Sequence, residues 1–405
     1  MERFDDRAKA VAIVTTENDV QVFEFSTTPV VQIPVRSGPI SGIVPSSDGS
    51  RLMVTNHGHN SVSVIDTDSW MVVETIADIE EPFAIAAGGD ADRAYVSTVS
   101  AAHDSIDVID LSTNTVVASH PLALSVSDLA VSPDGKYVYA SRNGARGADV
   151  AVLETATGKV RVIDIATAPG TTTECVRVSP DGARVYVGAN GPSGGQLVVI
   201  ETAARPEQAA AQTGSKARTS WRRKKPKNTA RSGASTAKGG HTGFGVVFTV
   251  EIGAPVRDVA LSSTGEVVYV ASCASDFGAL VDVVDTRTNE IIRTRKVSEI
   301  SGLLTGLTLS ADGARAYLVS DDSLTVLCTL THDVLGTVRA AKQPSCVVES
   351  PDGQYLYIAD YSGAVTVLPV ASAVTAAIEC ADADSEDGQD DWTVPELLER
   401  EAALV

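Results

Sequence analysis

A short turn motif recurs along this chain of 405 residues at a nearly constant spacing. The motif is Ser-Pro-Asp-Gly or a close variant, set between two runs of apolar residues. Its aspartate, or the residue in that place, stands at Asp48, Asp90, Asp134, Asp181, Thr264, Asp312 and Asp352. Successive motifs are separated by a period in the forties, except between Asp181 and Thr264, where an insertion lengthens the interval. Such a period with short strands is typical of β-propeller blades, not of helical solenoids.

The repeat at residues 43–76 illustrates why each unit predicts four strands. Apolar and polar residues alternate from Ser61 to Ile65, which indicates a half-buried strand, and Asp-Gly between apolar runs is common in hairpins. Because one blade cannot bury both of its faces, neighbouring blades must stack and the ring must close. We therefore expect an all-β protein, with a single propeller of four-stranded blades, A to D from the channel outward, over residues 9–380.

The number of blades depends on which strands are counted. Seven A strands precede the turns, but eight B–C hairpins are found, because residues 10–25 also align as one. Residues 30–35 would follow it as a D strand, and residues 374–379 would supply its A strand from the other end of the chain. This count predicts eight blades closed by the two termini, with seven blades as the alternative.

Composition restricts the class of protein further. Apolar residues make up 43% of the chain, and the formal charge of −20 disfavours binding to nucleic acid or anionic membranes over the whole surface. No apolar run reaches the ~18 residues of a membrane helix, and the acidic start does not resemble a signal peptide. Five cysteines without a spacing pattern suit a reducing compartment. We expect a cytoplasmic monomer that does not contact a membrane.

One segment cannot belong to the propeller core. Residues 205–243 contain no Val, Ile, Leu, Phe, Tyr or Met and carry ten Lys or Arg and one Glu. They separate a predicted C strand from its D strand, so we expect a flexible basic insertion in a C–D loop. It is either a tether without a partner or a contact for nucleic acid or an acidic protein. The candidate contact residues are Trp221, Arg222, Arg223, Lys224 and Lys225.

The C-terminal segment, residues 381–405, is acidic instead. Thr393 can cap a helix, with Glu396 completing a capping box and Pro395 at the first helical position. We predict a short amphipathic helix there, which packs on its own propeller, binds a partner or stays disordered. The candidate partner contacts are Trp392, Leu397 and Leu398.

The repeats resemble the YVTN family of bacterial and archaeal β-propellers. The resemblance is carried by residues 53–56 (Met-Val-Thr-Asn), 137–140 (Tyr-Val-Tyr-Ala), 186–189 (Tyr-Val-Gly-Ala) and 269–272 (Tyr-Val-Ala-Ser). It implies a bacterial propeller in a family that includes surface-layer and stress-associated proteins and is similar to seven-bladed lactonases. The residues shared with the family are structural, so the resemblance is specific for the fold and says little about activity.

The chain has no phosphate-binding, zinc-finger, zincin or nucleophile-elbow motif. B–C and D–A loops of a propeller share one rim around the central channel, and metal-ligating residue types fall there. The candidates for a ligand or divalent metal are His57, His59, His103, Asp149, Asp276 and Asp321. Solvated polar loop tips are the alternative interpretation.

These observations lead to one hypothesis and one alternative. We expect a non-catalytic interaction scaffold that binds another macromolecule, with a protein as the partner, through its rim loops and charged appendages. No cofactor is expected in that case. The alternative is a lactonase-like hydrolase with a divalent metal at the channel mouth. Cys175 and Cys346 fall in predicted inner strands, where small buried apolar side chains are expected.

Overall fold

The computed structural model describes residues 9–16, 19–26, 31–88, 93–100, 103–123, 125–144, 147–166, 169–202, 244–274, 278–300, 302–339 and 341–370. These residues form the strands β1 to β30 and one short 3₁₀ turn, η1 (His57–His59). No helix in these ranges is both long enough and apolar enough to cross a lipid bilayer. The prediction of an all-β protein is confirmed.

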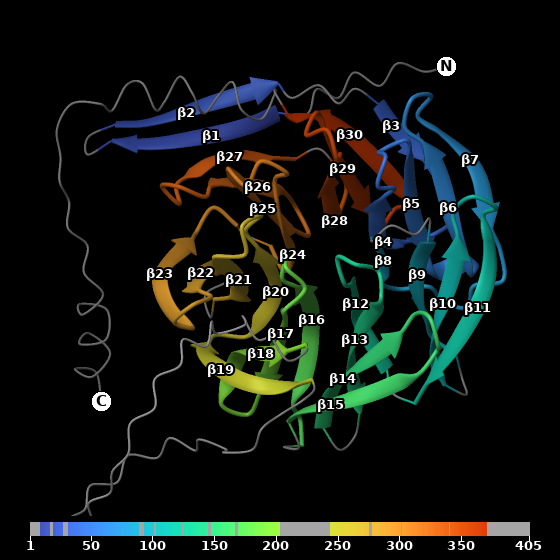
Figure 1. Ribbon diagram of the computed structural model, residues 1–405. Coiled ribbons are helices and arrows are strands. Elements are labelled where there is room, and N and C mark those ends of the chain that lie inside the picture. The colour runs from blue at the N-terminus through green and yellow to red at the C-terminus, as the bar shows by residue number, and fades with distance from the viewer. Residues whose placement is uncertain are drawn as a thin grey trace, which may run out of the picture.

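The strands form seven antiparallel sheets, which are the blades of one propeller (Figure 1). The first three blades are β4 (Ile40–Pro45), β5 (Arg51–Asn56), β6 (Ser61–Asp66) and β7 (Met71–Ile76); β8 (Ile85–Ala87), β9 (Arg93–Thr98), β10 (Asp104–Asp110) and β11 (Thr115–Leu122); and β12 (Ser125–Val131), β13 (Tyr137–Gly144), β14 (Gly147–Glu154) and β15 (Val160–Ala166). The next two are β16 (Thr172–Val178), β17 (Arg184–Gly191), β18 (Gly194–Glu201) and β19 (Gly245–Gly253); and β20 (Val256–Leu261), β21 (Val267–Cys273), β22 (Ala279–Asp285) and β23 (Glu290–Val297). The first strand of each blade lies innermost.

The last two blades include strands from the start of the chain. The sixth contains β24 (Leu304–Leu309), β25 (Arg315–Ser320), β26 (Leu324–Cys328) and β27 (Val334–Val338), with β1 (Lys9–Thr16) and β2 (Asp19–Ser26) added outside β27. The seventh contains β28 (Pro344–Glu349), β29 (Tyr355–Asp360), β30 (Ala364–Pro369) and β3 (Val31–Pro34). Contacts between inner strands link each blade to the next and β28 to β4, so the ring is closed.

The prediction of eight blades is wrong, and the alternative of seven is confirmed. The hairpin at residues 10–25 does form, with the expected pairing, but it lies along the outer edge of the sixth blade. Residues 31–34 form the predicted D strand, but in the blade that the C-terminal strands begin, where Ile33 pairs with Val365. The physical reason is that a hairpin without an inner strand does not reach the channel, and an open sheet edge offers it backbone partners. Residues 374–379 lie outside the described residues.

The repeated turn explains how each inner strand joins the next one. In the first blade, the Ser46 hydroxyl donates to the Asp48 carboxylate at 2.6 Å, and the backbone N–H of Ser46 bonds to the carbonyl of Arg51. Gly49 follows at φ +71°, a conformation that favours glycine. The hydrogen bond from the Ser46 hydroxyl, followed by those from the backbone N–H and the hydroxyl of Ser50, lowers the pKa of Asp48 to about 2. The same turn recurs in blades three, four, six and seven.

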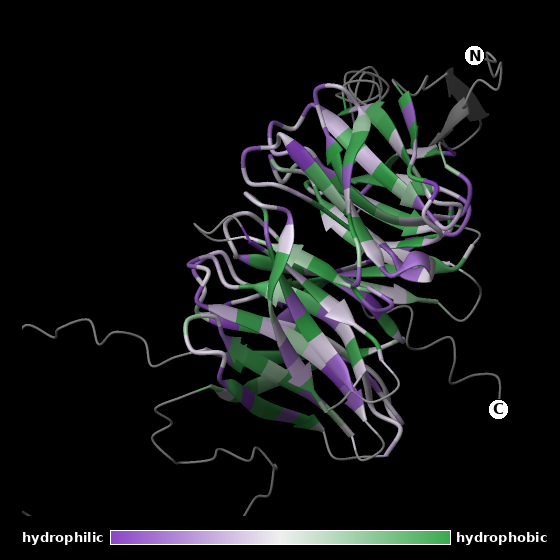
Figure 2. Ribbon diagram, turned by 90° about the vertical axis from the view of Figure 1, so that its right-hand side faces the viewer, coloured by the Kyte–Doolittle hydropathy of each residue, from purple (hydrophilic) through white to green (hydrophobic). Residues whose placement is uncertain are grey.

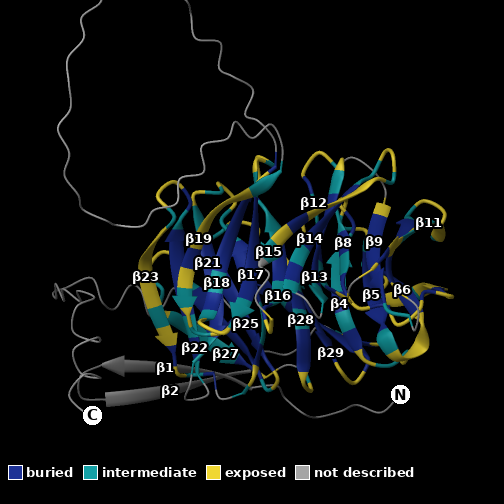
Figure 3. Ribbon diagram, turned by 90° about the horizontal axis from the view of Figure 1, so that it is seen from below, coloured by how far each residue is buried: buried dark blue, intermediate teal, exposed yellow. Residues whose placement is uncertain are grey.

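The core lies between the blades. Apolar side chains of adjacent sheets pack in clusters that each span two blades, while hydrophilic residues concentrate in the loops (Figure 2). Exposure is highest at the two rims and along the outermost strands, and the interior of each blade is buried (Figure 3). This packing holds the seven inner strands around a central channel.

Candidate ligand site in the central channel

The central channel contains a cavity of about 660 Å³. Most of its wall comes from the seven inner strands β4, β8, β12, β16, β20, β24 and β28 or from the loops that flank them, with Val319 of β25 and Tyr361 after β29 added. Its volume lies in the range of small-molecule sites, about 300–1,000 Å³. In five of the seven blades, one residue of the inner strand has no partner in the second strand, so the pairing register shifts there by one residue. The first paired residue after this shift is Asp128, Cys175, Asp258, Gly306 or Cys346. This equivalent position therefore carries a carboxylate in two blades, a thiol in two blades and no side chain in one blade.

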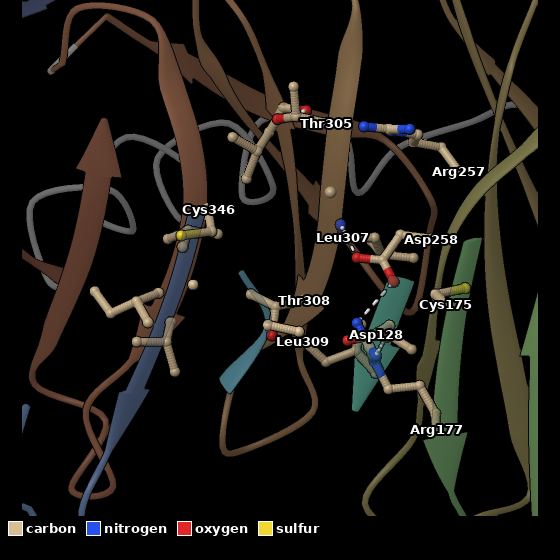
Figure 4. A pocket seen from close by; sticks show the side chains of 18 of the residues that line it. Asp128, Cys175, Arg177, Arg257, Asp258, Thr305, Leu307, Thr308, Leu309 and Cys346 are labelled. Carbon is tan, nitrogen blue, oxygen red and sulfur yellow. Dashed lines mark hydrogen bonds and ion pairs between the residues drawn. The ribbon is translucent and has the colours of Figure 1, made fainter. Parts of the chain in front are cut away.

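A partly buried ionic network joins three blades in the channel (Figure 4). The Arg177 guanidinium, from β16, forms ion pairs with Asp128 on β12 and with Asp258 on β20, the latter at 2.8 Å. Each carboxylate also accepts the backbone N–H of the next blade's inner strand: Val176 donates to Asp128 at 2.9 Å and Leu307 to Asp258 at 2.8 Å. Burial raises the pKa of Asp258, and the positive charge of Arg177 opposes that effect. These contacts fix the spacing of four adjacent blades.

A second ion pair lies beside the first in the channel wall. Arg257 and Glu174 immediately precede Asp258 and Cys175 in their strands, and an Arg257 Nη atom lies 3.4 Å from Glu174. The Arg257 side chain is 39% exposed, whereas its Nε atom is buried and has no hydrogen-bond acceptor among the described residues. The Thr172 hydroxyl donates to the other oxygen of Glu174 at 2.9 Å. Arg257 is therefore less fully bonded than Arg177.

The two cysteines of the channel are protonated thiols. Burial raises the pKa of Cys175 well above its usual value, and desolvation raises that of Cys346 to about 12. A Cβ atom on Gly188 of the adjacent strand would lie 2.7 Å from the Cys175 sulfur, so this thiol is tightly packed. The prediction that both residues lie in inner strands is confirmed. As thiols, they are poor nucleophiles and poor metal ligands.

Exposed apolar side chains gather at the end of the channel where the inner strands begin. Phe83 precedes β8 and Tyr361 follows β29, and both line the cavity. Leu303, just before β24, is exposed on the same rim. Exposed aromatic and aliphatic side chains around a concave opening are typical of binding sites. We refer to Phe83, Glu174, Arg257 and Tyr361 as the channel mouth.

The described members of the predicted metal or ligand set lie on this rim or next to it, but they do not assemble into one centre. His57 and His59 form η1, and the His57 ring packs edge-on against Phe83 with centroids 6.4 Å apart. His103 lies in an exposed loop, where its backbone N–H donates to the Ser100 hydroxyl. Within the described part of the chain, no three His, Cys, Asp or Glu side chains are arranged to hold a metal ion.

The predicted carboxylates make other contacts. Asp149 accepts a hydrogen bond from Arg142 at 2.7 Å, and Asp321 accepts one from the backbone N–H of Leu303 at 2.8 Å. Asp276 lies outside the described residues, as do all the predicted partner contacts and the predicted C-terminal helix. Those residues are Trp221, Arg222, Arg223, Lys224, Lys225, Trp392, Leu397 and Leu398. In the sequence, residues 205–243 fall between β18 and β19, and they too lie outside the described residues.

Sequence reasoning missed the ionic residues of the channel wall. Arg177 and Asp128 stand inside predicted inner strands, two and four residues before the serine of a repeated turn. A charged residue inside a strand that must face neighbouring blades requires a partner, and this signal is present in the sequence. The identity of each partner depends on the ring, because the paired residues lie 49 and 81 positions apart.

A comparison with curated proteins identifies a relative that matches almost the entire chain. It is the seven-bladed beta-propeller protein Rv1057 of Mycobacterium tuberculosis, which is 55% identical over 397 residues, 97% of this chain and 98% of that protein. The chain belongs to this family of seven-bladed β-propeller proteins. A second relative, Antigen Lp49 of Leptospira interrogans, is 27% identical over 168 residues, 39% of this chain and 35% of that protein.

Two further comparisons concern the fold. A chain of the hydrazine synthase of Kuenenia stuttgartiensis superimposes with a TM-score of 0.65 at 20% identity, over 83% of this propeller and 96% of that chain, a likeness of fold alone. The family model of the cytochrome D1 heme domain matches residues 6–173. The described wall of the channel includes no histidine or methionine, two common axial ligands of haem iron.

Proposed function

We propose that this propeller is a non-catalytic binding protein and that the channel mouth is its recognition site for a protein partner. The observation that carries the proposal is the exposure of Phe83 and Tyr361 at the same opening as the under-bonded Arg257. Aromatic and arginine side chains contribute most to the free energy of binding in protein interfaces.

The chemistry of the channel favours binding over hydrolysis. A lactonase-like mechanism needs carboxylates that are free to hold a metal ion or to activate water. Asp128 and Asp258 are instead each bonded to Arg177 and to a backbone N–H. The thiols of Cys175 and Cys346 are not activated as nucleophiles. The four described cysteines are free, which supports the cytoplasmic location that we propose from the sequence.

Site-specific photocrosslinking tests the proposal. A benzophenone amino acid is incorporated in place of Tyr361, which is 43% exposed at the mouth, in the full chain expressed in its native host. The control position is Leu330, which is 83% exposed in a turn on the opposite rim. We expect an adduct of defined mass from position 361 and none from position 330. Equal labelling at the two positions, or no adduct at 361, would overturn the proposal.

A turnover assay tests the non-catalytic part. The purified full chain is incubated with a panel of lactones, with Mg²⁺, Ca²⁺, Mn²⁺ or Zn²⁺ added in turn. We expect hydrolysis at the buffer rate in every case. Metal-dependent turnover that Arg257→Gln abolishes would establish the hydrolase alternative in its place.

A further inference from the structure

We propose that the channel mouth binds a carboxylate attached to an apolar group, and that Arg257 receives the carboxylate. The inference rests on the proposed function, because it names the chemistry recognised at the same opening. Such a group belongs either to a small organic acid or to the C-terminal residue of a partner's polypeptide. The experiment below distinguishes these two sources.

A comparison of the two channel arginines assigns the role to Arg257. Arg177 donates to Asp128, to Asp258 and to the carbonyl oxygen of Val176 at 2.7 Å. Arg257 has one contact of 3.4 Å with Glu174, and its side chain is 39% exposed to the channel. A guanidinium binds a carboxylate through two parallel hydrogen bonds, which a single contact of 3.4 Å does not achieve. Arg257 is thus the cation that still gains from an added anion.

Glu174 can release Arg257 without losing all of its hydrogen bonds. Its Oε1 atom accepts the Thr172 hydroxyl at 2.9 Å, while only Oε2 faces Arg257. A ligand carboxylate that replaces Glu174 on the guanidinium therefore leaves Glu174 bonded and partly exposed. In this exchange, Arg257 loses its single 3.4 Å contact with Glu174 and gains two parallel hydrogen bonds to the ligand carboxylate, which favours binding.

The opposite side of the mouth suits an apolar group. Phe83 and Tyr361 line the same cavity as Arg257, and both are large side chains with exposed rings. The Phe83 loop is held in place, because the Ser41 hydroxyl donates to the Phe83 carbonyl at 3.0 Å. Burial of the exposed ring surface against an apolar group is favourable.

The charge of the protein limits the ligand to a single carboxylate. The chain has a formal charge of −20, and Glu174 lies next to the arginine. A ligand with several negative charges is repelled by this field, whereas one carboxylate is matched by one guanidinium. The apolar group must then supply the remaining affinity.

Isothermal titration calorimetry on the full chain tests the inference. The probes are 4-phenylbutyrate and its neutral amide, together with a glycine–serine pentapeptide that ends in phenylalanine with a free or an amidated C-terminus. The variants are Arg257→Gln and Glu174→Gln. Arg287→Gln is the matched control, because it removes an exposed arginine from the opposite rim of the same blade.

We expect the free acids to bind at least 10-fold more tightly than the matching amides. Arg257→Gln should weaken the acids by about 10- to 100-fold, which is about 1.4 to 2.7 kcal/mol, and Arg287→Gln should leave them unchanged. Glu174→Gln should tighten binding, because it removes the competing carboxylate. Preference for the peptide acid identifies a chain end as the ligand, and preference for 4-phenylbutyrate identifies a small acid.

Three results would overturn the inference: no binding of either acid at millimolar concentration, equal binding of acids and amides, or equal loss in Arg257→Gln and Arg287→Gln. A failure to fold in Arg257→Gln does not block the test, because Glu174→Gln gives an opposite and independent signal. If the acids do not bind but the crosslink at position 361 persists, the carboxylate assignment alone is wrong. If the acids bind but no crosslink forms, the protein partner alone is wrong.

Discussion

Shortening one side chain in β3 tests how the ring closes. Ile33 is 2% exposed and pairs with Val365, and its cluster contains Ile40 and Leu52 of the first blade. Its side chain therefore packs at the junction between the last blade and the first. Ile33→Ala removes buried carbon and leaves a cavity between sheets that cannot easily collapse, so we expect a loss of about 3 kcal/mol. That is a large fraction of the ~5–15 kcal/mol that stabilises a typical domain.

Urea unfolding measured by fluorescence gives the assay. Trp70 packs against Tyr355 and Tyr357, with ring centroids 5.3 and 6.0 Å apart, and it borders the same cluster as Ile33. Replacing the other two tryptophans with phenylalanine makes Trp70 the sole reporter. The matched control is Gln32→Ala, an exposed position on the same strand, which we expect to cost less than about 0.5 kcal/mol. If Ile33→Ala costs no more than Gln32→Ala, the reasoning that β3 closes the ring is refuted.

Three further predictions concern charge and the insertion. Arg177→Met should lower the free energy of unfolding at pH 7 by about 1–3 kcal/mol, because the partly buried Asp128 and Asp258 lose their countercharge, and the loss should shrink as acid protonates Asp258. Burial raises the pKa of Asp282, so the wild type should lose stability as the pH rises through that pKa. Asp282→Asn should remove this loss. In urea titrations at pH 7, it should raise the free energy of unfolding by on the order of 1 kcal/mol. Replacing residues 207–241 by a short glycine–serine turn should leave the melting temperature, measured by calorimetry, within a few degrees of the wild-type value, because each doubling of loop length costs only about 0.6 kcal/mol. An insoluble product would contradict this prediction.

Local features of the fold were predictable because they depend on neighbouring residues. The turn at Asp48 needs only the residues between Ser46 and Arg51, and the hairpin at residues 10–25 needs only its own alternation. The place where that hairpin docks depends on which sheet edge is free. That edge is β27, which lies near the other end of the chain, so the hairpin count led to eight blades. The pairing of β3 with β30 is non-local in the same way.

The candidate site was less predictable for a related reason. The sequence predicted that B–C and D–A loops share one rim, and His57 does lie beside the mouth, against Phe83. The histidines and aspartates on the rim were predicted as metal ligands from their residue type alone. The difference between Arg177, which is saturated, and Arg257, which is not, depends on the partners that the ring brings to each. No spacing in the sequence encodes that difference.

The pairing of β3 with β30 has a consequence for synthesis on the ribosome. Ile33 is translated near the start of the chain, whereas Val365, its partner in the finished sheet, belongs to the last described strand. At a synthesis rate of about 5–20 residues per second, β3 waits roughly 17 to 66 seconds for that partner. During this interval the backbone groups of β3 lack their partner strand, and Ile33 has only the contacts within the first part of the ring, such as Ile40 and Leu52. The nascent chain therefore carries β3 without its sheet partner until β30 has been translated, so the ring cannot close before that point.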